Sequence, residues 1–352
     1  MTEDKRITIK DIAQLAGVSK GTVDRVIHNR GEVSEASRQK VLEVAQRIGY
    51  KPNIYASLLA SQKKYLMACL LPDYGPGEYW ERVAQGLEAA RKKSEPFNID
   101  IRLFTYDLFS IESFQKGYAE MIAHQPDAIV LAPTFREKVR GLVNELSRKE
   151  IPCLLIDSYL SDCPYLAYYG MPMFQSGYLA AHLLLDRQPA QQVAIFRIHK
   201  DKDALNNSAE RRREGFMSYL ADHHLECALV EEYIHPYDSD FNGAVLERFF
   251  RNNPDIRHII TFNSRVHLIA EQLEREKREN TILVGFDDLP KNIEGLKKGS
   301  IQFLIAQHSE NLLSYCTDTV INRLIYHNPP EKQNHFVPMD ILTRYNADYY
   351  RF

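Results

Sequence analysis

Residues 7–30 read ITIKDIAQLAGVSKGTVDRVIHNR, and this stretch predicts two short helices joined by a tight turn. Thr8 is placed to cap the first helix, and Asp11, three residues on, completes a capping box. Gly17 suits the turn between two steeply crossing helices, because glycine adopts positive φ angles without a steric cost. Ser19 is placed to cap the second helix. The pattern is typical of a helix-turn-helix, although any small three-helix module could also carry it.

The second predicted helix presents short or basic side chains on the side away from its apolar residues. Several of them donate hydrogen bonds to base edges or to phosphates, so duplex DNA is the predicted partner. A third helix is expected to begin at Ser34 and to stop at Gly49. Pro52 prevents its continuation, and the short stretch 54–61 is apolar on too many sides to be an inert linker.

These segments resemble the lactose-repressor (LacI/GalR) family of bacterial transcription regulators. The resemblance rests on IKDIAQLAGVSKGTVDRVIHN, on VSEASRQKVLEVAQRIGYKPN and on ASLLAS, all within the first 62 residues. It implies a recognition helix from Ser19 to about Asn29 and a hinge helix from about Asn53 to Ala60. In the family the hinge folds only on DNA, where a leucine that matches Leu59 wedges into the minor groove of a palindromic operator.

The DNA contacts expected from the pattern and from the resemblance lie on the predicted helices and the hinge. They are Thr8, Ser19, Lys20, Gly21, Thr22, Asp24, Arg25, His28 and Asn29, followed by Asn53, Ala56 and Leu59. Two positions depart from the family. A serine usually stands where this chain has Asp24, and a longer side chain often reads a base where it has Gly21. Both departures bear on the operator sequence rather than on DNA binding itself.

The composition places a basic head on an acidic body. The chain has 352 residues, 44% of them hydrophobic, and a formal net charge of -3, which suits two or three packed domains and excludes a polybasic chain. The five scattered cysteines form no C-x-x-C motif, so reduced thiols are expected. The first residues, MTEDKRIT, lack an apolar signal region, and no apolar run approaches membrane-spanning length, so a cytoplasmic protein is expected.

Beyond Lys64 short apolar runs alternate with amphipathic stretches, which predicts parallel sheets covered by helices on both faces. The units exceed one sheet, so two α/β lobes are expected. The predicted strands are 66–71, 99–104, 128–131, 153–156, 193–198, 258–262 and 282–286, and the predicted helices include 81–93, 110–123, 175–185 and 210–220.

The body also resembles the family, and looks like a type I periplasmic-binding-protein fold. Motifs that carry this resemblance include WERVAQGLEAA, DAIVLAPT, YYGMPMFQSGYLAAHLL and ILVGFDDLP. The resemblance implies a ligand cleft between two doubly wound lobes, at the carboxyl ends of the strands. The expected division is a helix-turn-helix domain at 1–52, a hinge at 53–64 and a core at 65–352. Within the core, lobe 1 covers about 65–166 and 301–329 and lobe 2 about 167–300 and 334–352, with crossovers near 165–168, 299–301 and 329–334.

Ligand contacts are expected at the positions that match the family's cleft. Trp80, with Tyr79 beside it, would stack on a sugar ring, unless it merely covers a helix start. Asp157 and Asp287 follow strands and would accept hydrogen bonds from ligand hydroxyls, unless they cap the next loop. Another contact is expected at Gln307, in the segment LIAQ. Asn263 matches the asparagine of the family's usual Asn-Asp pair and is also an expected contact, although Ser264 replaces the aspartate of that pair.

One member of the arginine run 211–213 is also expected to reach the ligand. Successive helical residues point in different directions, so at most one or two of the three can face the cleft, and Arg211 is the predicted one. The position that best matches the family's ligand arginine is occupied by Glu210. This departure argues for a ligand that differs from those of the best-known relatives.

An enzyme, or an α/β binding protein whose N-terminal module does not bind DNA, is the alternative. The chain shows no G-x-S-x-G elbow, no P-loop and no metal-ligand histidine spacing, so no catalysis, cofactor or metal is expected. A solute-binding protein of a transporter would need export, which the sequence does not indicate.

The expected mechanism joins the two parts. Two chains related by a two-fold axis place recognition helices in successive major grooves of a palindromic operator, and a sugar or sugar derivative bound in each core alters the hinge. The coupling is reciprocal, and the effector acts either as an inducer or as a co-repressor. The tail ILTRYNADYYRF lacks a leucine heptad, so a homodimer is expected.

Overall fold

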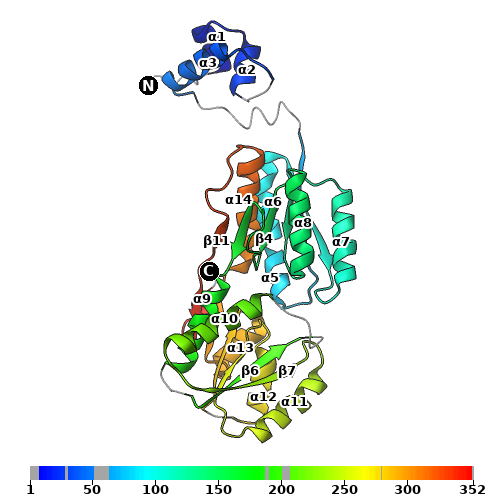
Figure 1. The fold of residues 1–352 in the computed structure, drawn as a ribbon, viewed down its shortest axis with the longest axis vertical. Helices are drawn as coiled ribbons and strands as arrows, with labels where there is room; N and C mark the ends of the chain where they lie inside the picture. Colours follow the sequence, from blue (N-terminus) through cyan, green and yellow to red (C-terminus); the bar gives the residue numbers. More distant parts are fainter. Residues whose placement is uncertain are drawn as a thin grey trace. The chain divides into compact units, whose positions relative to one another are not determined.

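The computed structural model describes residues 8–27, 31–50, 63–186, 190–199, 207–278 and 280–350. The chain divides into two compact units, Met1–Lys63 and Lys64–Phe352, which Figure 1 shows as a small helical body and a larger α/β body. Each unit is described by itself below.

The described residues of the first unit form three short helices around a small apolar core. Gly17 ends the first helix in the left-handed conformation, with φ 64°, and so supplies the tight turn that the sequence predicts. The Oγ of Ser19 accepts a hydrogen bond from the backbone N–H of Thr22 at 3.0 Å, as an N-terminal cap does. The helices are α1 (Ile9–Ala16), α2 (Lys20–Ile27) and α3 (Glu35–Arg47). The core contains Ile12, Ala13, Ala16, Val23, Val26, Val41, Val44 and Ala45.

The second unit contains two sheets that share one strand order. In the first sheet the order is β11-β5-β4-β3-β1-β2, and in the second it is β12-β10-β9-β8-β6-β7. Neighbouring strands are parallel except for β12, which runs antiparallel to β10. The first sheet contains β1 (Tyr65–Pro72), β2 (Ile99–Tyr106), β3 (Ala128–Leu131), β4 (Cys153–Ile156), β5 (Ala167–Gly170) and β11 (Asn334–Phe336). The second contains β6 (Gln192–Ile198), β7 (Ala228–Ile234), β8 (His258–Ile260), β9 (Ile282–Phe286), β10 (Phe303–Ala306) and β12 (Asp340–Leu342).

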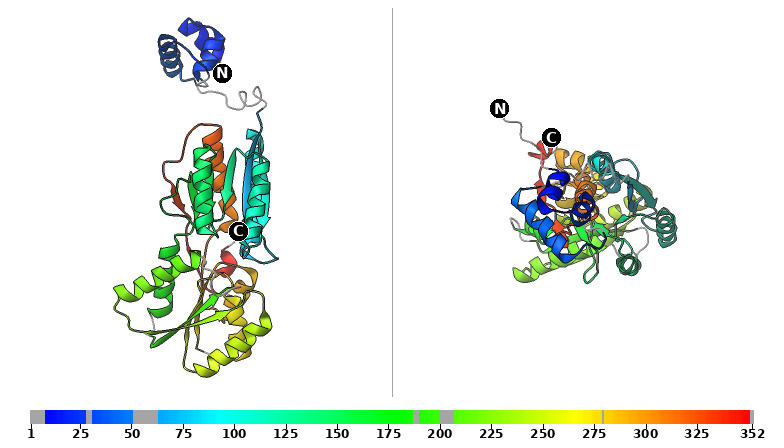
Figure 2. Two further views of the ribbon diagram at one scale, coloured as in Figure 1. Left: turned by 45° about the vertical axis from the view of Figure 1, so that its right-hand side comes forward. Right: turned by 90° about the horizontal axis from the view of Figure 1, so that it is seen from above.

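Helices cover both faces of each sheet, as Figures 1 and 2 show. Strand β1 alternates between the two cores of its sheet: Met67, Cys69 and Leu71 pack on one face, and Ala68 and Leu70 on the other. The first sheet is flanked by α5 (Tyr79–Gln85), α6 (Leu87–Ser94), α7 (Ile111–Ala123), α8 (Arg136–Arg148) and α14 (Leu312–Leu324). The second is flanked by α9 (Met173–Leu185), α10 (Asn207–Asp222), α11 (Ser239–Asn252), α12 (His267–Arg275) and α13 (Pro290–Lys298). Short 3-10 turns lie at η1 (Glu95–Phe97), η2 (Ser309–Asn311) and η3 (Ala347–Tyr349).

This arrangement confirms the predicted fold of two doubly wound lobes, and the structure corrects the places where the chain crosses between them. Strand β5 belongs to the first sheet and β10 to the second, so the crossovers lie at about 171–172, 307–311 and 337–339 rather than near 165–168, 299–301 and 329–334. The strands β5, β10 and β11 have only three or four residues. The predicted lobe boundaries fall several residues too early because the sheet that such a short strand joins is decided by partners far along the chain.

The predicted helix at 81–93 is two helices in the structure. Helices α5 and α6 meet at Gly86, where an added Cβ would overlap the backbone carbonyl of Glu310. The close approach comes from the crossover segment after β10, which no local pattern reveals. None of the helices in the described part of the chain combines the length and hydrophobicity needed to cross a bilayer.

Candidate functional sites: the second helix and the cleft between the lobes

The outer side of helix α2 carries the predicted DNA contacts. Val23 and Val26 of α2 point into the core of the first unit, so the opposite side of the helix lies on the surface. Ser19, Lys20, Gly21 and Arg25 are exposed, as is Thr8 at the start of α1, while Thr22 and Asp24 are half-buried. His28, Asn29, Asn53, Ala56 and Leu59 lie outside the described residues. The exposed face therefore offers hydroxyl and basic groups of the kind that contact phosphates and base edges.

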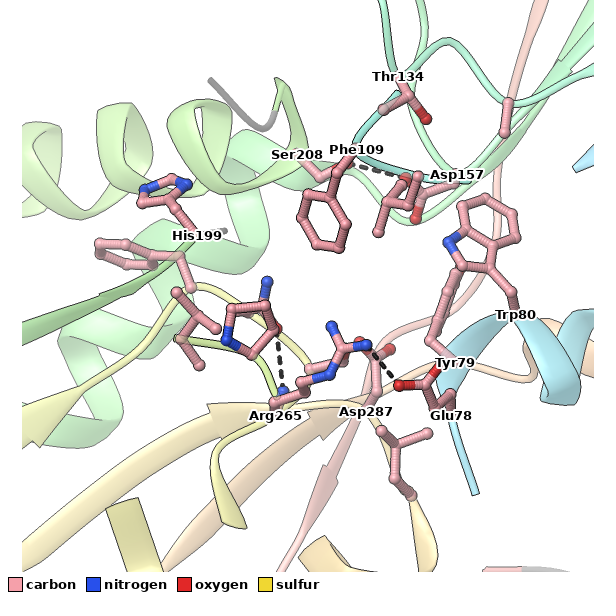
Figure 3. Close-up of a pocket in the computed structure, with 18 of the residues that line it drawn as sticks. Glu78, Tyr79, Trp80, Phe109, Thr134, Asp157, His199, Ser208, Arg265 and Asp287 are labelled. Carbon is pink, nitrogen blue, oxygen red and sulfur yellow. Dashed lines mark hydrogen bonds and ion pairs between the residues drawn. The ribbon is translucent and has the colours of Figure 1, made fainter. Parts of the chain in front are cut away.

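A cavity of about 260 Å3 lies between the two lobes of the second unit. It is open at one side and is lined from both sheets, as Figure 3 shows for ten labelled side chains. Of the residues that the sequence predicts as ligand contacts, the cavity brings together Tyr79, Trp80, Asp157, Asn263 and Asp287.

Two aspartates occupy equivalent positions in the two lobes. Asp157 follows β4 and Asp287 follows β9, which hold the same place in their sheets. Both have left-handed backbones, with φ 69° and 64°, a conformation that aspartate tolerates better than most residues. Their backbone N–H groups donate to the carbonyls of Tyr169 and Ile305, at 3.2 and 3.0 Å. The pseudo-symmetric fold thus aims two carboxylates at one cavity from opposite sides.

Burial shapes the electrostatics of both carboxyls. Burial raises the pKa of Asp157, while Arg212 and the hydroxyls of Ser208 and Tyr79 oppose the rise; the Ser208 hydroxyl donates to Asp157 Oδ2 at 2.9 Å. Burial also raises the pKa of Asp287 to about 6, with Arg212 opposing and Asp157 adding to the shift. The Oδ1 atom of Asp287 is buried without a hydrogen-bond partner. It is an unpaired acceptor buried beside the cavity that Asp287 lines.

The arginine that reaches the cavity is Arg212, and the prediction of Arg211 is corrected. Arg212 is buried, its Nη1 donates to the Phe262 carbonyl at 2.9 Å, and its guanidinium lies 4.0 Å from the centre of the Phe286 ring. Arg211 instead pairs with Glu214 one helical turn on, at 2.5 Å, away from the cavity. The rotation of α10 about its axis decides between adjacent residues, and that rotation is set by packing against α9 rather than by the sequence run.

The aromatic wall consists of Tyr79 and Trp80 at the start of α5. Their rings meet edge to face with centroids 5.1 Å apart, and both are buried apart from the side that lines the cavity. Gln307 stands behind this wall and does not line the cavity. Its Nε2 donates to the Tyr79 hydroxyl at 3.2 Å, and its Oε1 accepts from the Met171 backbone at 3.1 Å. Because it lies in one crossover and bonds to another, it positions Tyr79 rather than touching a ligand.

A bridge between the lobes closes one side of the cavity and was missed from the sequence. Arg265, which follows β8, donates to Glu78 before α5 at 2.6 Å and to the Tyr237 hydroxyl at 3.0 Å (Figure 3 draws the first contact). The Tyr237 ring in turn lies edge-on to Phe109 of the first lobe, with centroids 6.1 Å apart. Asn263 accepts a hydrogen bond from the Arg265 backbone at 3.1 Å and so holds this loop. The two partners of the bridge lie 187 residues apart, so no local signal indicates the pair.

Two family models match this chain. The model for bacterial regulatory proteins of the lacI family matches residues 8–53, and that for a periplasmic binding protein domain matches residues 67–325, well over half of the chain. A crystal structure described as a LacI transcriptional regulator from Bacteroides fragilis is 36% identical, with a TM-score of 0.77, and covers 82% of this chain and 100% of that chain.

Further similarity is found among curated proteins and among transport proteins. The sucrose operon repressor of Escherichia coli is 25% identical over 305 residues, which are 80% of this chain and 84% of the relative. GanP, a glucose-galactose binding protein from Geobacillus stearothermophilus, is 19% identical with a TM-score of 0.67 and covers 81% of this chain and 99% of that chain; this likeness concerns the fold alone. A protein described as the probable HTH-type transcriptional repressor ExuR of Bacillus subtilis is 24% identical over 251 residues, which are 69% of this chain and 68% of the relative. The chain therefore belongs to the LacI family of bacterial regulatory proteins, with a periplasmic binding protein domain as its second unit.

Proposed function

We propose that this regulator binds a palindromic operator as a homodimer, and that a carbohydrate held between its lobes controls its affinity for the operator. The observation that carries the proposal is the cavity between the lobes, with an aromatic wall and two opposed carboxylates, in a chain whose helix α2 also presents an exposed polar and basic face. Carboxylates accept hydrogen bonds from hydroxyls, and aromatic faces cover the C–H side of a sugar ring. That the similar Escherichia coli protein is a repressor of the sucrose operon adds support.

The dimer follows from the size of the DNA-binding unit. Helix α2 has eight residues, so one copy reads only a few base pairs, whereas two copies related by a two-fold axis read successive major grooves. The proposed partners are thus duplex DNA, a second copy of the chain and a small-molecule effector. Because a bacterial regulator acts on chromosomal DNA, we place its action in the cytoplasm.

The proposal is tested with the full-length protein. Selection from a pool of random duplexes should enrich a palindromic site, and sedimentation of the protein with that duplex should give two chains for each site. A screen of monosaccharides against the complex should then find a compound that changes operator affinity. Recovery of no preferred site, or of a one-chain complex, would contradict the corresponding part of the proposal.

Arg25 is expected to contribute to operator recognition. Arg25→Ala should weaken operator binding by roughly 1–3 kcal/mol if the guanidinium reads a base, while thermal stability should change little because the side chain is exposed. Fluorescence anisotropy titrations at fixed salt measure the effect. Arg148→Ala, which removes an exposed arginine from α8 of the second unit, is the matched control. Equal affinities of the two variants would remove Arg25 from the interface.

Leu59 is expected to act as the minor-groove wedge, by its match to the family. Leu59→Ala should reduce operator affinity and DNA bending, while leaving effector affinity nearly intact, because the wedge meets only DNA. Energy transfer between dyes at the two ends of the operator measures the bend. A bend equal to that of the wild type, or a loss of stability in the free protein, would refute the wedge.

A further inference from the structure

Acidic side chains outnumber basic ones around the cavity. Among the described residues that line it, the carboxylates are Asp73, Glu78, Asp157 and Asp287, and the Lys or Arg side chains are Arg212 and Arg265. Arg265 is engaged by Glu78 at 2.6 Å, and both are largely buried, with 13% and 22% of their side chains exposed. Arg212 is shared between two carboxyls, because its charge stabilises the ionised forms of both Asp157 and Asp287. A ligand anion would therefore add negative charge to a lining in which four carboxylates already face two guanidiniums.

The remaining groups near the cavity do not reverse this balance. Burial lowers the pKa of His199 and of His267, so both imidazoles are neutral at pH 7. His267 is also held by Asn292, 2.9 Å from its Nδ1.

Among the residues that line the cavity, one buried acceptor atom and one buried donor atom have no hydrogen-bond partner in the described structure. The acceptor is Asp287 Oδ1, and the donor is Arg212 Nε. A hydroxyl group satisfies both needs, because it donates one hydrogen bond while accepting others. A carboxylate or a phosphate only accepts, and it would meet the Asp287 charge in a site of low dielectric.

The size of the cavity suits a ligand with a single ring. Its volume of about 260 Å3 lies just below the range of about 300–1,000 Å3 typical of pockets for drug-sized ligands. The Glu78–Arg265 pair and the contact between Phe109 and Tyr237 join the lobes at its side, so a second sugar ring would have to break them.

We propose that the cleft takes a neutral, single-ring polyhydroxyl ligand and rejects sugar acids, sugar phosphates and disaccharides, with Glu78 as a specificity-determining residue that keeps Arg265 from pairing with a ligand anion. This inference rests on the proposed function and names the ligand class of the same site. A relative whose cleft has a Lys or Arg side chain without an acidic partner would instead be expected to bind an acidic sugar.

The first experiment is calorimetric titration of the full-length protein with matched compounds. The neutral set is D-glucose, D-galactose, D-ribose and D-allose, and the comparison set is D-glucuronate, D-galacturonate, D-glucose 6-phosphate and sucrose. A neutral monosaccharide is expected to bind at least tenfold more tightly than its acidic and phosphorylated counterparts and than sucrose. A tighter or equal affinity for any comparison compound, or no binding by the neutral set, would overturn the inference.

The second experiment tests the role of Glu78. Glu78→Gln removes the charge that engages Arg265 but keeps an amide oxygen for the Gly75 N–H, which now donates to Glu78 Oε2 at 3.0 Å. The preference for a neutral hexose over its uronate should fall at least tenfold. Glu88→Gln removes an equal charge from an exposed residue of α6 and should leave the preference unchanged. An unchanged preference in Glu78→Gln, with circular dichroism like that of the wild type, would overturn the role of Glu78.

Operator binding, measured on the same preparations, distinguishes a wrong ligand class from a failure of the proposed function. If operator binding is intact and an anion or a disaccharide is the preferred ligand, only the ligand class is wrong. If no operator is bound, the proposed function itself fails, whatever the titrations give.

Discussion

Asp287→Asn is expected to make the unliganded protein more stable at neutral pH and to abolish its response to effector. The carboxyl is buried, and its pKa is raised from 3.8 to about 6, so ionising it in the folded protein costs about 3 kcal/mol at 1.36 kcal/mol per pKa unit. Asparagine is uncharged and, like aspartate, tolerates the left-handed backbone at this position. The gain should therefore approach that cost at pH 7.

The difference in stability between Asp287→Asn and the wild type should increase as the pH rises. Because the folded protein binds this proton more tightly than the unfolded chain does, the wild type loses stability as the pH rises from about 4 to about 6. Asp287→Asn should lack this part of the loss, so the two proteins converge near pH 4. Thermal denaturation across this range measures the difference. Asp240→Asn, at an exposed position of α11, is the control and should change stability by less than about 0.5 kcal/mol.

The same substitution should cost ligand binding. Asparagine keeps one acceptor oxygen but replaces the other by an NH2 group, which cannot accept a hydrogen bond. Each ligand hydroxyl that loses its acceptor in this way costs about 1–3 kcal/mol, so the ligand should no longer change operator affinity at concentrations that saturate the wild type. Operator binding without ligand should be preserved. A variant that is less stable than the wild type at pH 7, or that still responds to ligand, would show that Asp287 is paired and structural.

Gly177→Ala is expected to destabilise the core and to displace the cavity's arginine. Helices α9 and α10 pack so closely that an added Cβ at Gly177 would overlap the backbone carbonyl of Arg212. At Gly215 an added Cβ would likewise overlap the carbonyl of Phe174. Backbone cannot give way as a flexible side chain can, so α10 must move as a whole, at a cost of about 1–3 kcal/mol or more.

The matched control is an alanine in another helix. Gly141 lies in α8, where an added Cβ meets nothing within 4 Å, so Gly141→Ala should stabilise the protein by about 0.5–1 kcal/mol. Urea denaturation followed by circular dichroism measures both variants. Ligand affinity should also fall in Gly177→Ala, because Ser208 and Arg212 both lie on α10. Equal stabilities of the two variants would mean that α9 and α10 are not in backbone contact.

Local sequence patterns account for the parts of the fold that depend on local chemistry. The capping residues and Gly17 predict the helix-turn-helix, and the structure contains it with the expected turn. Short apolar runs predict the strands β1, β2, β3, β4, β6, β8 and β9, since most residues of a parallel strand covered on both faces are apolar. The short strands at the crossovers escaped prediction, because their place in a sheet is decided by partners far along the chain.

The sequence by itself determined the helix-turn-helix and the two-lobed α/β architecture, because periodicity, caps and turns are local properties. The resemblance of its motifs to known relatives indicated the family and the carboxylates and aromatics of the cleft. Only the tertiary structure decided that Arg212 rather than Arg211 reaches the cavity, and that Gln307 stands behind Tyr79. It also paired Glu78 with Arg265 across the lobes. These facts depend on how helices rotate against one another and on which distant segments meet, and packing sets both once the whole chain has folded.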